Sequence, residues 1–89
     1  MYFVYVLQSL NDGKTYVGFS DNVERRLHEH NAGKSKSTKH RRPFKILFTE
    51  EFNNSQEAKR RELWWKSSSG RRKLKEFFER AHGHKLLEP

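Results

Sequence analysis

The apolar pattern of the chain begins with residues 2–8, which carry large apolar side chains at both odd and even positions. In an extended chain, the odd and even positions would form two apolar faces, Phe3/Tyr5/Leu7 and Tyr2/Val4/Val6. A strand that is apolar on both faces is usually covered on both sides. We therefore predict that this first strand is central in its sheet.

A polar segment with Asn-Asp-Gly at its centre separates this run from a second apolar run, residues 15–19. These turn residues tolerate the positive φ that hairpin turns require. A turn centred on this segment places Tyr5 roughly opposite Gly18 and Tyr16 roughly opposite Leu7. Because Gly18 has no side chain, it leaves room above it for Tyr5 or for a ligand.

A first helix is predicted after the hairpin. Asp21 and Glu24 have the spacing of a capping box, with Asp21 as the N-cap. Val23 and Leu27 would form the buried stripe of this helix. Gly33 is placed to end it as the C′ residue.

A third strand is predicted over residues 44–49, with Phe44, Ile46 and Phe48 on one face. A second helix follows, with Asn54 and Glu57 in capping-box spacing.

A last helix is predicted over residues 71–82, ended by Gly83 and followed by a frayed tail, residues 84–89. Its apolar stripe would consist of Leu74, Phe77, Phe78 and Ala81. We therefore expect a single domain, residues 1–83. Its fold class would be α/β, a small three-stranded mixed or antiparallel sheet flanked by helices.

Charge is the strongest compositional signal. The chain has 19 Lys and Arg against 11 Asp and Glu, a net charge of +8 and a pI near 10.1. An acidic polymer would relieve the resulting self-repulsion, so nucleic acid is the expected partner. The simpler alternative is a basic protein whose charge serves only solubility.

The chain has no cysteine, which excludes disulfides and thiolate zinc sites among its 89 residues. No apolar run approaches the length of a membrane span, and we see no signal-peptide pattern. We therefore expect a cytoplasmic protein without a membrane partner.

The segment from Gly33 to Leu47 contains no acidic residue. We expect its cations, with a second group near residue 71, to contact phosphates without reading base sequence. The candidate nucleic-acid-binding residues are Lys34, Lys36, Lys39, Arg41, Arg42, Arg71 and Arg72. For each of them, a solvated surface charge is the simpler interpretation.

Five residues stand out as candidates for chemistry. Taken singly, Tyr5 and Tyr16 are ordinary core tyrosines, and Arg26 and His30 are ordinary helix residues four positions apart. Glu62 is less ordinary, because it shares a helix face with apolar residues, where an internal ion pair with an arginine would explain it. The simple explanations account for each residue but not for their convergence.

Together these residues match a family. The runs Val4-Tyr5-Val6 and Tyr16-Val17-Gly18, followed by Arg26, His30 and Glu62, resemble the GIY-YIG nuclease domain. The first tripeptide departs from Gly-Ile-Tyr but keeps its tyrosine. The chain looks most like the small stand-alone bacterial members of this family.

The resemblance implies a role for each residue. Glu62 would be the metal ligand, for a single Mg²⁺ or Mn²⁺, and Arg26 would contact the scissile phosphate. Tyr5 and Tyr16 would orient or deprotonate the attacking water, and His30 would accept a proton or hold a tyrosine hydroxyl. The general base stays open among Tyr5, Tyr16 and His30.

The leading hypothesis is a metal-dependent endonuclease that hydrolyses phosphodiesters in DNA, structure-selective or nonspecific, with DNA repair as a setting. The alternative is a nucleic-acid-binding module with the nuclease fold and little cleavage activity. Nothing in the sequence distinguishes RNA from DNA as the substrate. A protein partner and the oligomeric state also stay open.

Overall fold

The computed structural model describes residues 1–76 of the chain and contains one antiparallel sheet. Its strands are β1 (Tyr2–Ser9), β2 (Thr15–Ser20) and β3 (Phe44–Phe52), in the order β2-β1-β3. The predicted central position of the first strand is confirmed. The hairpin register is confirmed as well, because Tyr5 pairs with Gly18 and Leu7 pairs with Tyr16.

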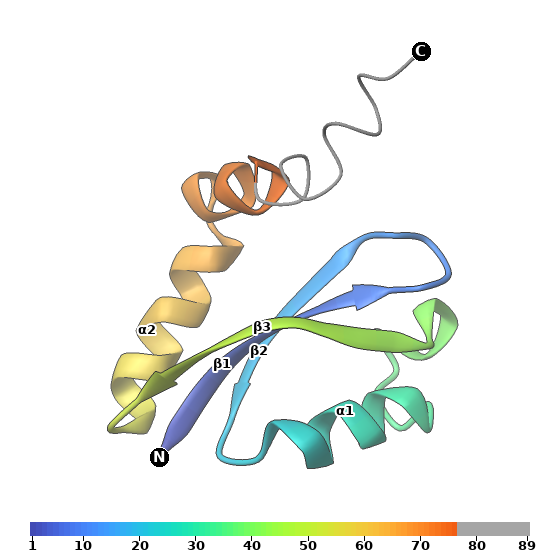
Figure 1. Cartoon of the computed structure of the whole chain (residues 1–89), viewed down its shortest axis with the longest axis horizontal. Coiled ribbons are helices and arrows are strands. Elements are labelled where there is room, and N and C mark those ends of the chain that lie inside the picture. Colours follow the sequence, from blue (N-terminus) through green and yellow to red (C-terminus); the bar gives the residue numbers. More distant parts are fainter. Residues whose placement is uncertain (77–89) are drawn as a thin grey trace.

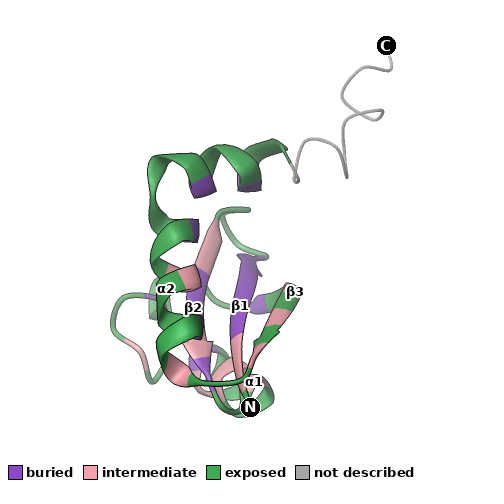
Figure 2. Cartoon of the chain, turned by 90° about the vertical axis from the view of Figure 1, so that its left-hand side faces the viewer, coloured by how far each residue is buried: buried purple, intermediate pink, exposed green. Residues whose placement is uncertain are grey.

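Helices cover both faces of the sheet (Figure 1). On one face, Val23 and Leu27 of α1 (Val23–Asn31) pack against Tyr5, Leu7 and Phe44. On the other face, α2 (Ser55–Lys66) contributes its apolar residues to a second cluster. That cluster contains Val4, Val6, Val17, Ala58, Trp65 and Leu74. This arrangement explains why β1 is apolar on both sides and buried along most of its length (Figure 2).

The first helix is capped by a residue other than the predicted one. The prediction of Asp21 as N-cap is wrong, because the Asn22 side chain accepts the hydrogen bond from the Arg25 N–H at 3.0 Å. Asp21 instead pairs with the Arg25 guanidinium at 3.1 Å. An asparagine caps as well as an aspartate does, and here the chain turns into the helix one residue later than predicted. Gly33 follows the helix with a φ of +78°, as its predicted C′ position requires.

The third strand is longer than predicted and changes face. It continues to Phe52, and its register against β1 shifts between Val6 and Leu7. Such an irregularity breaks the two-residue alternation of a strand. As a result, Phe44 packs beside Tyr5, whereas Phe48 packs on the other face. Ile46, which is partly exposed, pairs with Leu7 on the face of Phe44. The prediction that all three residues share one face is therefore wrong for Phe48.

The second helix begins as predicted, since the Asn54 side chain accepts from the Glu57 N–H at 2.9 Å. The last helix begins at residue 68 rather than 71 and continues to residue 76, where the described part ends. Its Leu74 is buried. Phe77, Phe78, Ala81, Gly83, the tail and the domain boundary at residue 83 lie outside the described residues.

Two connections fix the segment between Asn31 and Phe44. The Asn31 side chain accepts from the Phe44 N–H at 2.7 Å and donates to the Phe44 carbonyl at 3.2 Å. This pair joins the end of α1 to the start of β3. Between them, a short 3₁₀ turn, η1 (Lys39–Arg41), replaces part of the predicted irregular loop. No helix within residues 1–76 is long and apolar enough to cross a membrane.

Gly70 gives a direct test of how the last helix packs on α2. A Cβ at Gly70 would lie 2.6 Å from the Trp65 carbonyl carbon and still closer to the Trp64 carbonyl oxygen. Backbone atoms cannot yield as a flexible side chain can, so we expect Gly70→Ala to lower the free energy of unfolding by about 1–3 kcal/mol. Ser69→Ala, at the exposed neighbouring position, should change it by less than about 0.5 kcal/mol.

Urea denaturation of the two variants measures both values. Equal stability of Gly70→Ala and Ser69→Ala would show that the two helices do not approach each other so closely.

Candidate active site

The site is built on the contact between Tyr5 and Gly18. The phenol ring of Tyr5 lies over the bare backbone of Gly18, its cross-strand partner. A Cβ at Gly18 would lie 2.6 Å from Tyr5 Cζ and still closer to the hydroxyl. The room predicted above Gly18 is therefore filled by Tyr5, which is 1% exposed.

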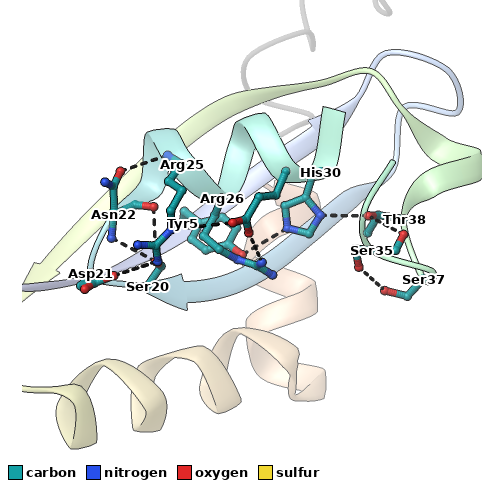
Figure 3. A network of polar contacts seen from close by, with 11 residues as sticks. Tyr5, Ser20, Asp21, Asn22, Arg25, Arg26, His30, Ser35, Ser37 and Thr38 are labelled. Carbon is teal, nitrogen blue, oxygen red and sulfur yellow. Dashed lines mark hydrogen bonds and ion pairs between the residues drawn. The ribbon is translucent and has the colours of Figure 1, made fainter. Parts of the chain in front are cut away.

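The first helix brings Arg26 and His30 to this phenol, because residues four apart lie on one side of a helix. His30 is fully buried, and its Nε2 lies 3.3 Å from the Tyr5 hydroxyl. Arg26 also hydrogen-bonds to this hydroxyl, and Glu29 forms an ion pair with Arg26. Figure 3 shows the three side chains converging, with His30 between Tyr5 and Thr38.

The environment sets the charge states of these groups. Burial raises the pKa of the Tyr5 phenol, and the hydrogen bond from Arg26 offsets part of that rise. Burial also lowers the pKa of His30, and the charge of Arg26 lowers it further. The hydrogen bond to Tyr5 raises the pKa of Arg26. At neutral pH the site therefore contains a neutral phenol, a neutral imidazole able to accept a proton, and a fixed positive charge.

Tyr16 connects this group to the second helix. Its ring packs edge-on against His30, with centroids 4.8 Å apart. The Lys66 ammonium lies 6.0 Å from the Tyr16 ring centroid and pairs with Glu62 at 3.1 Å. The Glu62 side chain is only 13% exposed. Glu62 is near enough to Tyr5 for its charge to contribute to the raised pKa of the phenol.

The donor set limits the metal that the site suits. Within residues 1–76 no three His, Cys, Asp or Glu side chains come together as a metal cluster. Glu62 is a single, largely buried carboxylate with a cation already beside it. A lone carboxylate fits Mg²⁺, which keeps several waters and uses few protein ligands, and does not fit a cage of protein donors.

The predicted nucleic-acid-binding residues fall into two groups. Lys34, Lys36 and Lys39 are exposed, as are Arg71 and Arg72 on the last helix.

Arg41 is half-buried and has hydrogen-bond partners within the protein, whereas Arg42 is exposed but packs over Gly33. The Arg41 guanidinium donates to Asp12 at 3.0 Å and to the Thr15 carbonyl at 3.2 Å. Arg42 lies over Gly33, since a Cβ there would lie 2.5 Å from Arg42 Nη1. These contacts connect residues 34–42, which we call the basic loop, to the hairpin turn and to the end of α1.

Sequence reasoning missed Thr38. It is fully buried, and its hydroxyl lies 2.9 Å from His30 Nδ1. A β-branched residue inside a run of lysines and arginines is the one sequence signal that marks it. The contact joins residues from a loop and a helix, so no local periodicity reveals it.

Comparisons with known proteins show which family this chain resembles. The family model of the GIY-YIG catalytic domain matches residues 1–75. A UPF0213 protein of Streptococcus agalactiae is 44% identical over 73 residues, which cover 81% of this chain and 82% of that protein. A UPF0213 protein of Staphylococcus haemolyticus is 42% identical over 80 residues, covering 89% of this chain and 96% of that protein.

A solved structure is also similar. The solution NMR structure of a UPF0213 protein from Bacillus halodurans superposes with a TM-score of 0.51 at 34% identity. The match covers 86% of this chain and 85% of that one. The names of these relatives state no reaction.

The buried imidazole gives a measurable signature. We expect an NMR pH titration to place the pKa of His30 below the ordinary value of about 6.5. Since the folded state then binds this proton more weakly than the unfolded chain, His30 lowers the free energy of unfolding as the pH falls below about 6.5. Arg26→Gln should raise the pKa of His30, because it removes the second cause of the shift. A His30 pKa at or above 6.5 in the wild-type protein would contradict this description of the site.

Proposed function

The chain belongs to the GIY-YIG catalytic domain family, and we propose that it is a metal-dependent endonuclease that hydrolyses phosphodiester bonds in DNA. Membership of this family implies nuclease-type chemistry on a nucleic acid. The metal, the choice of DNA and the roles of individual residues are our proposal.

The observation that carries the proposal is the convergence of five side chains from four elements. Tyr5 comes from β1, Tyr16 from β2, Arg26 and His30 from α1, and Glu62 from α2. The imidazole contacts both phenols, and Lys66, which pairs with Glu62, links the Tyr16 ring to the carboxylate. A structural role for each residue separately would not require a proton acceptor, a phenol, a guanidinium and a carboxylate at one place.

In the proposed mechanism, Tyr5 relays a proton. The attacking water loses its proton to the Tyr5 oxygen while the phenolic proton moves to Nε2 of His30, 3.3 Å away. Both ring nitrogens of His30 already face hydroxyls, Nε2 that of Tyr5 and Nδ1 that of Thr38, so in this mechanism His30 acts through Tyr5 and not on the water itself. The low pKa of His30 leaves it unprotonated and ready for this role at neutral pH. Tyr16 packs against the imidazole and limits its movement.

Arg26 supplies positive charge beside the Tyr5 phenol. Arg26 hydrogen-bonds to Tyr5, so it stabilises negative charge on that oxygen, and its remaining N–H donors suit a phosphate. Glu62 would hold Mg²⁺ or Mn²⁺, and the ion, when bound, would neutralise phosphate charge and lower the pKa of a bound water. Lys66, which pairs with Glu62 in this structure, would have to release the carboxylate for Glu62 to hold the ion.

The proposed substrate selection is by shape and charge. The exposed lysines of the basic loop and the arginines of the last helix suit phosphate contacts, which position a duplex without reading bases. No described element has a row of side chains suited to reading base edges. We therefore propose a structure-selective or nonspecific activity.

One observation favours a second candidate, a nucleic-acid-binding module with little cleavage activity. The ammonium of Lys66 already satisfies Glu62 at 3.1 Å, as it would in a domain that no longer binds a metal. The two candidates differ in metal-dependent product formation and not in affinity, since charge alone supports binding in both.

Cleavage of labelled duplex, single-stranded, flap and branched DNA tests the proposal, with single-stranded RNA included for comparison. We expect cutting with Mg²⁺ or Mn²⁺ and none with chelator. Glu62→Gln should lose activity on the order of 10²-fold or more, because a neutral amide no longer holds the ion. Glu57→Gln, on the exposed first turn of the same helix, is the matched control and should cut normally.

Binding without cutting across the whole panel would favour the binding module. Equal cleavage by Glu62→Gln and wild type would remove Glu62 from the mechanism.

A further inference from the structure

Thr38 contributes a buried hydroxyl to a loop that is otherwise rich in exposed cations. Its side chain is fully buried, whereas Ser37 and Lys39 on either side are exposed. Its Oγ1 lies 2.9 Å from His30 Nδ1 and 3.5 Å from the Ser35 carbonyl oxygen, to which the hydroxyl donates. Figure 3 shows His30 held between the Thr38 and Tyr5 hydroxyls.

Ser35, Thr38, His30 and Tyr5 form a row of hydrogen-bonded groups. The direction of each hydrogen bond in this row follows from which groups are able to donate a proton. A carbonyl oxygen only accepts, so the Thr38 proton points at Ser35 and the Thr38 oxygen is left to accept from His30 Nδ1. A neutral imidazole carries one proton, so Nε2 is then bare and accepts from the Tyr5 hydroxyl.

The other end of the row leads to the same assignment. Arg26 has only donors, and it hydrogen-bonds to the Tyr5 oxygen. If Nε2 of His30 carried the proton, the Tyr5 oxygen would receive hydrogen bonds from both Arg26 and His30. The phenolic proton of Tyr5 would then have no acceptor on the imidazole. With Nε2 bare, each proton in the row has one acceptor. Both ends therefore favour the tautomer with its proton on Nδ1.

We propose that Thr38 is a positioning residue that fixes His30 in the tautomer with Nδ1 protonated, so that Nε2 can take the proton of Tyr5. This inference rests on the proposed nuclease function, in which His30 is the final proton acceptor. Thr38 itself touches neither the substrate nor the reacting atoms. The partner of the second ring nitrogen of a histidine commonly sets which nitrogen is free for chemistry.

The same contact gives the basic loop a second role. The loop that carries the exposed Lys36 and Lys39 is held on one side by Thr38 and on the other by the Arg41–Asp12 ion pair. A nucleic acid bound by those lysines would press on the segment that orients His30. The basic loop thus helps to orient His30 and is also a candidate nucleic-acid-binding surface.

Two variants separate the hydroxyl of Thr38 from its bulk. Thr38→Val keeps the branched shape and removes the hydroxyl, and Thr38→Ser keeps the hydroxyl and removes a methyl group. Ser37→Ala is the control, because it changes an exposed hydroxyl of the same loop. Circular dichroism and thermal unfolding establish that each variant is folded before it is compared.

The first readout is the tautomer of His30, measured by long-range ¹H–¹⁵N NMR correlation at neutral pH without nucleic acid or metal. The signals of His30 are identified by their loss in His30→Gln. We expect the wild type, Thr38→Ser and Ser37→Ala to have a protonated Nδ1 and a bare Nε2. Thr38→Val should shift toward a protonated Nε2, because a buried Nδ1–H would have lost its acceptor.

The second readout is the cleavage rate with Mg²⁺. Thr38→Val should cut on the order of 10²-fold more slowly at saturating DNA, as for other losses of a group that orients a histidine. Thr38→Ser should restore most of the rate, and the affinity for DNA should stay unchanged in both. A purely packing role would produce the opposite order, with valine tolerated better than serine.

The two readouts keep this inference distinguishable from the proposed function. A wild-type His30 protonated at Nε2 would overturn the inference whether or not Thr38→Val folds. Normal tautomer and normal cleavage in Thr38→Val would also overturn it. If the wild type has the expected tautomer and Thr38→Val alters it but no substrate is cut, the positioning role of Thr38 stands and the nuclease proposal fails.

Discussion

The structure of the site depends on a phenol ring resting on a residue without a side chain. Tyr5 lies in the central strand, which is buried on both faces. Its ring can lie over the backbone of β2 only because the residue opposite it is Gly18. That position brings its hydroxyl within reach of His30 and Arg26 on the helix above. Any residue larger than glycine at position 18 would displace the ring, and the polar contacts of the hydroxyl would be lost with it.

The helices on the two faces of the sheet contribute different groups to the site. The first helix supplies the imidazole and the guanidinium, and the second helix is fixed in rotation by a half-buried polar contact on the far face. There Glu50 accepts from the Trp65 indole at 2.7 Å and from Arg61 through both of its oxygens. These hydrogen bonds lower the pKa of Glu50 despite its burial, so the carboxylate stays charged. With Trp65 held there, Glu62 on the same helix pairs with Lys66, and Lys66 lies near the Tyr16 ring of β2.

Local chemistry made much of this predictable from the sequence. The turn residues and the two-residue alternation locate Tyr5 opposite Gly18, and helical spacing puts Arg26 and His30 on one side of α1. The family resemblance added the roles, since spacing alone leaves each residue with a plausible structural explanation. The register shift in β3 was missed because it depends on how the strand pairs with β1, and the apolar pattern of β3 itself does not reveal it. Thr38 was missed for a related reason, because its burial results from a loop folding onto a helix eight residues earlier.

Removal of one oxygen atom tests the central claim, that the Tyr5 hydroxyl is the atom around which the site is built. Tyr5→Phe keeps the ring over Gly18 and removes the group that faces His30 and Arg26. The cleavage rate should fall on the order of 10²-fold or more, with DNA affinity unchanged and with a loss of about 1 kcal/mol in the free energy of unfolding. Tyr2→Phe, which alters a phenol packed on the opposite face, should leave all three values close to those of the wild type. Cleavage by Tyr5→Phe at the wild-type rate would contradict this account of the site.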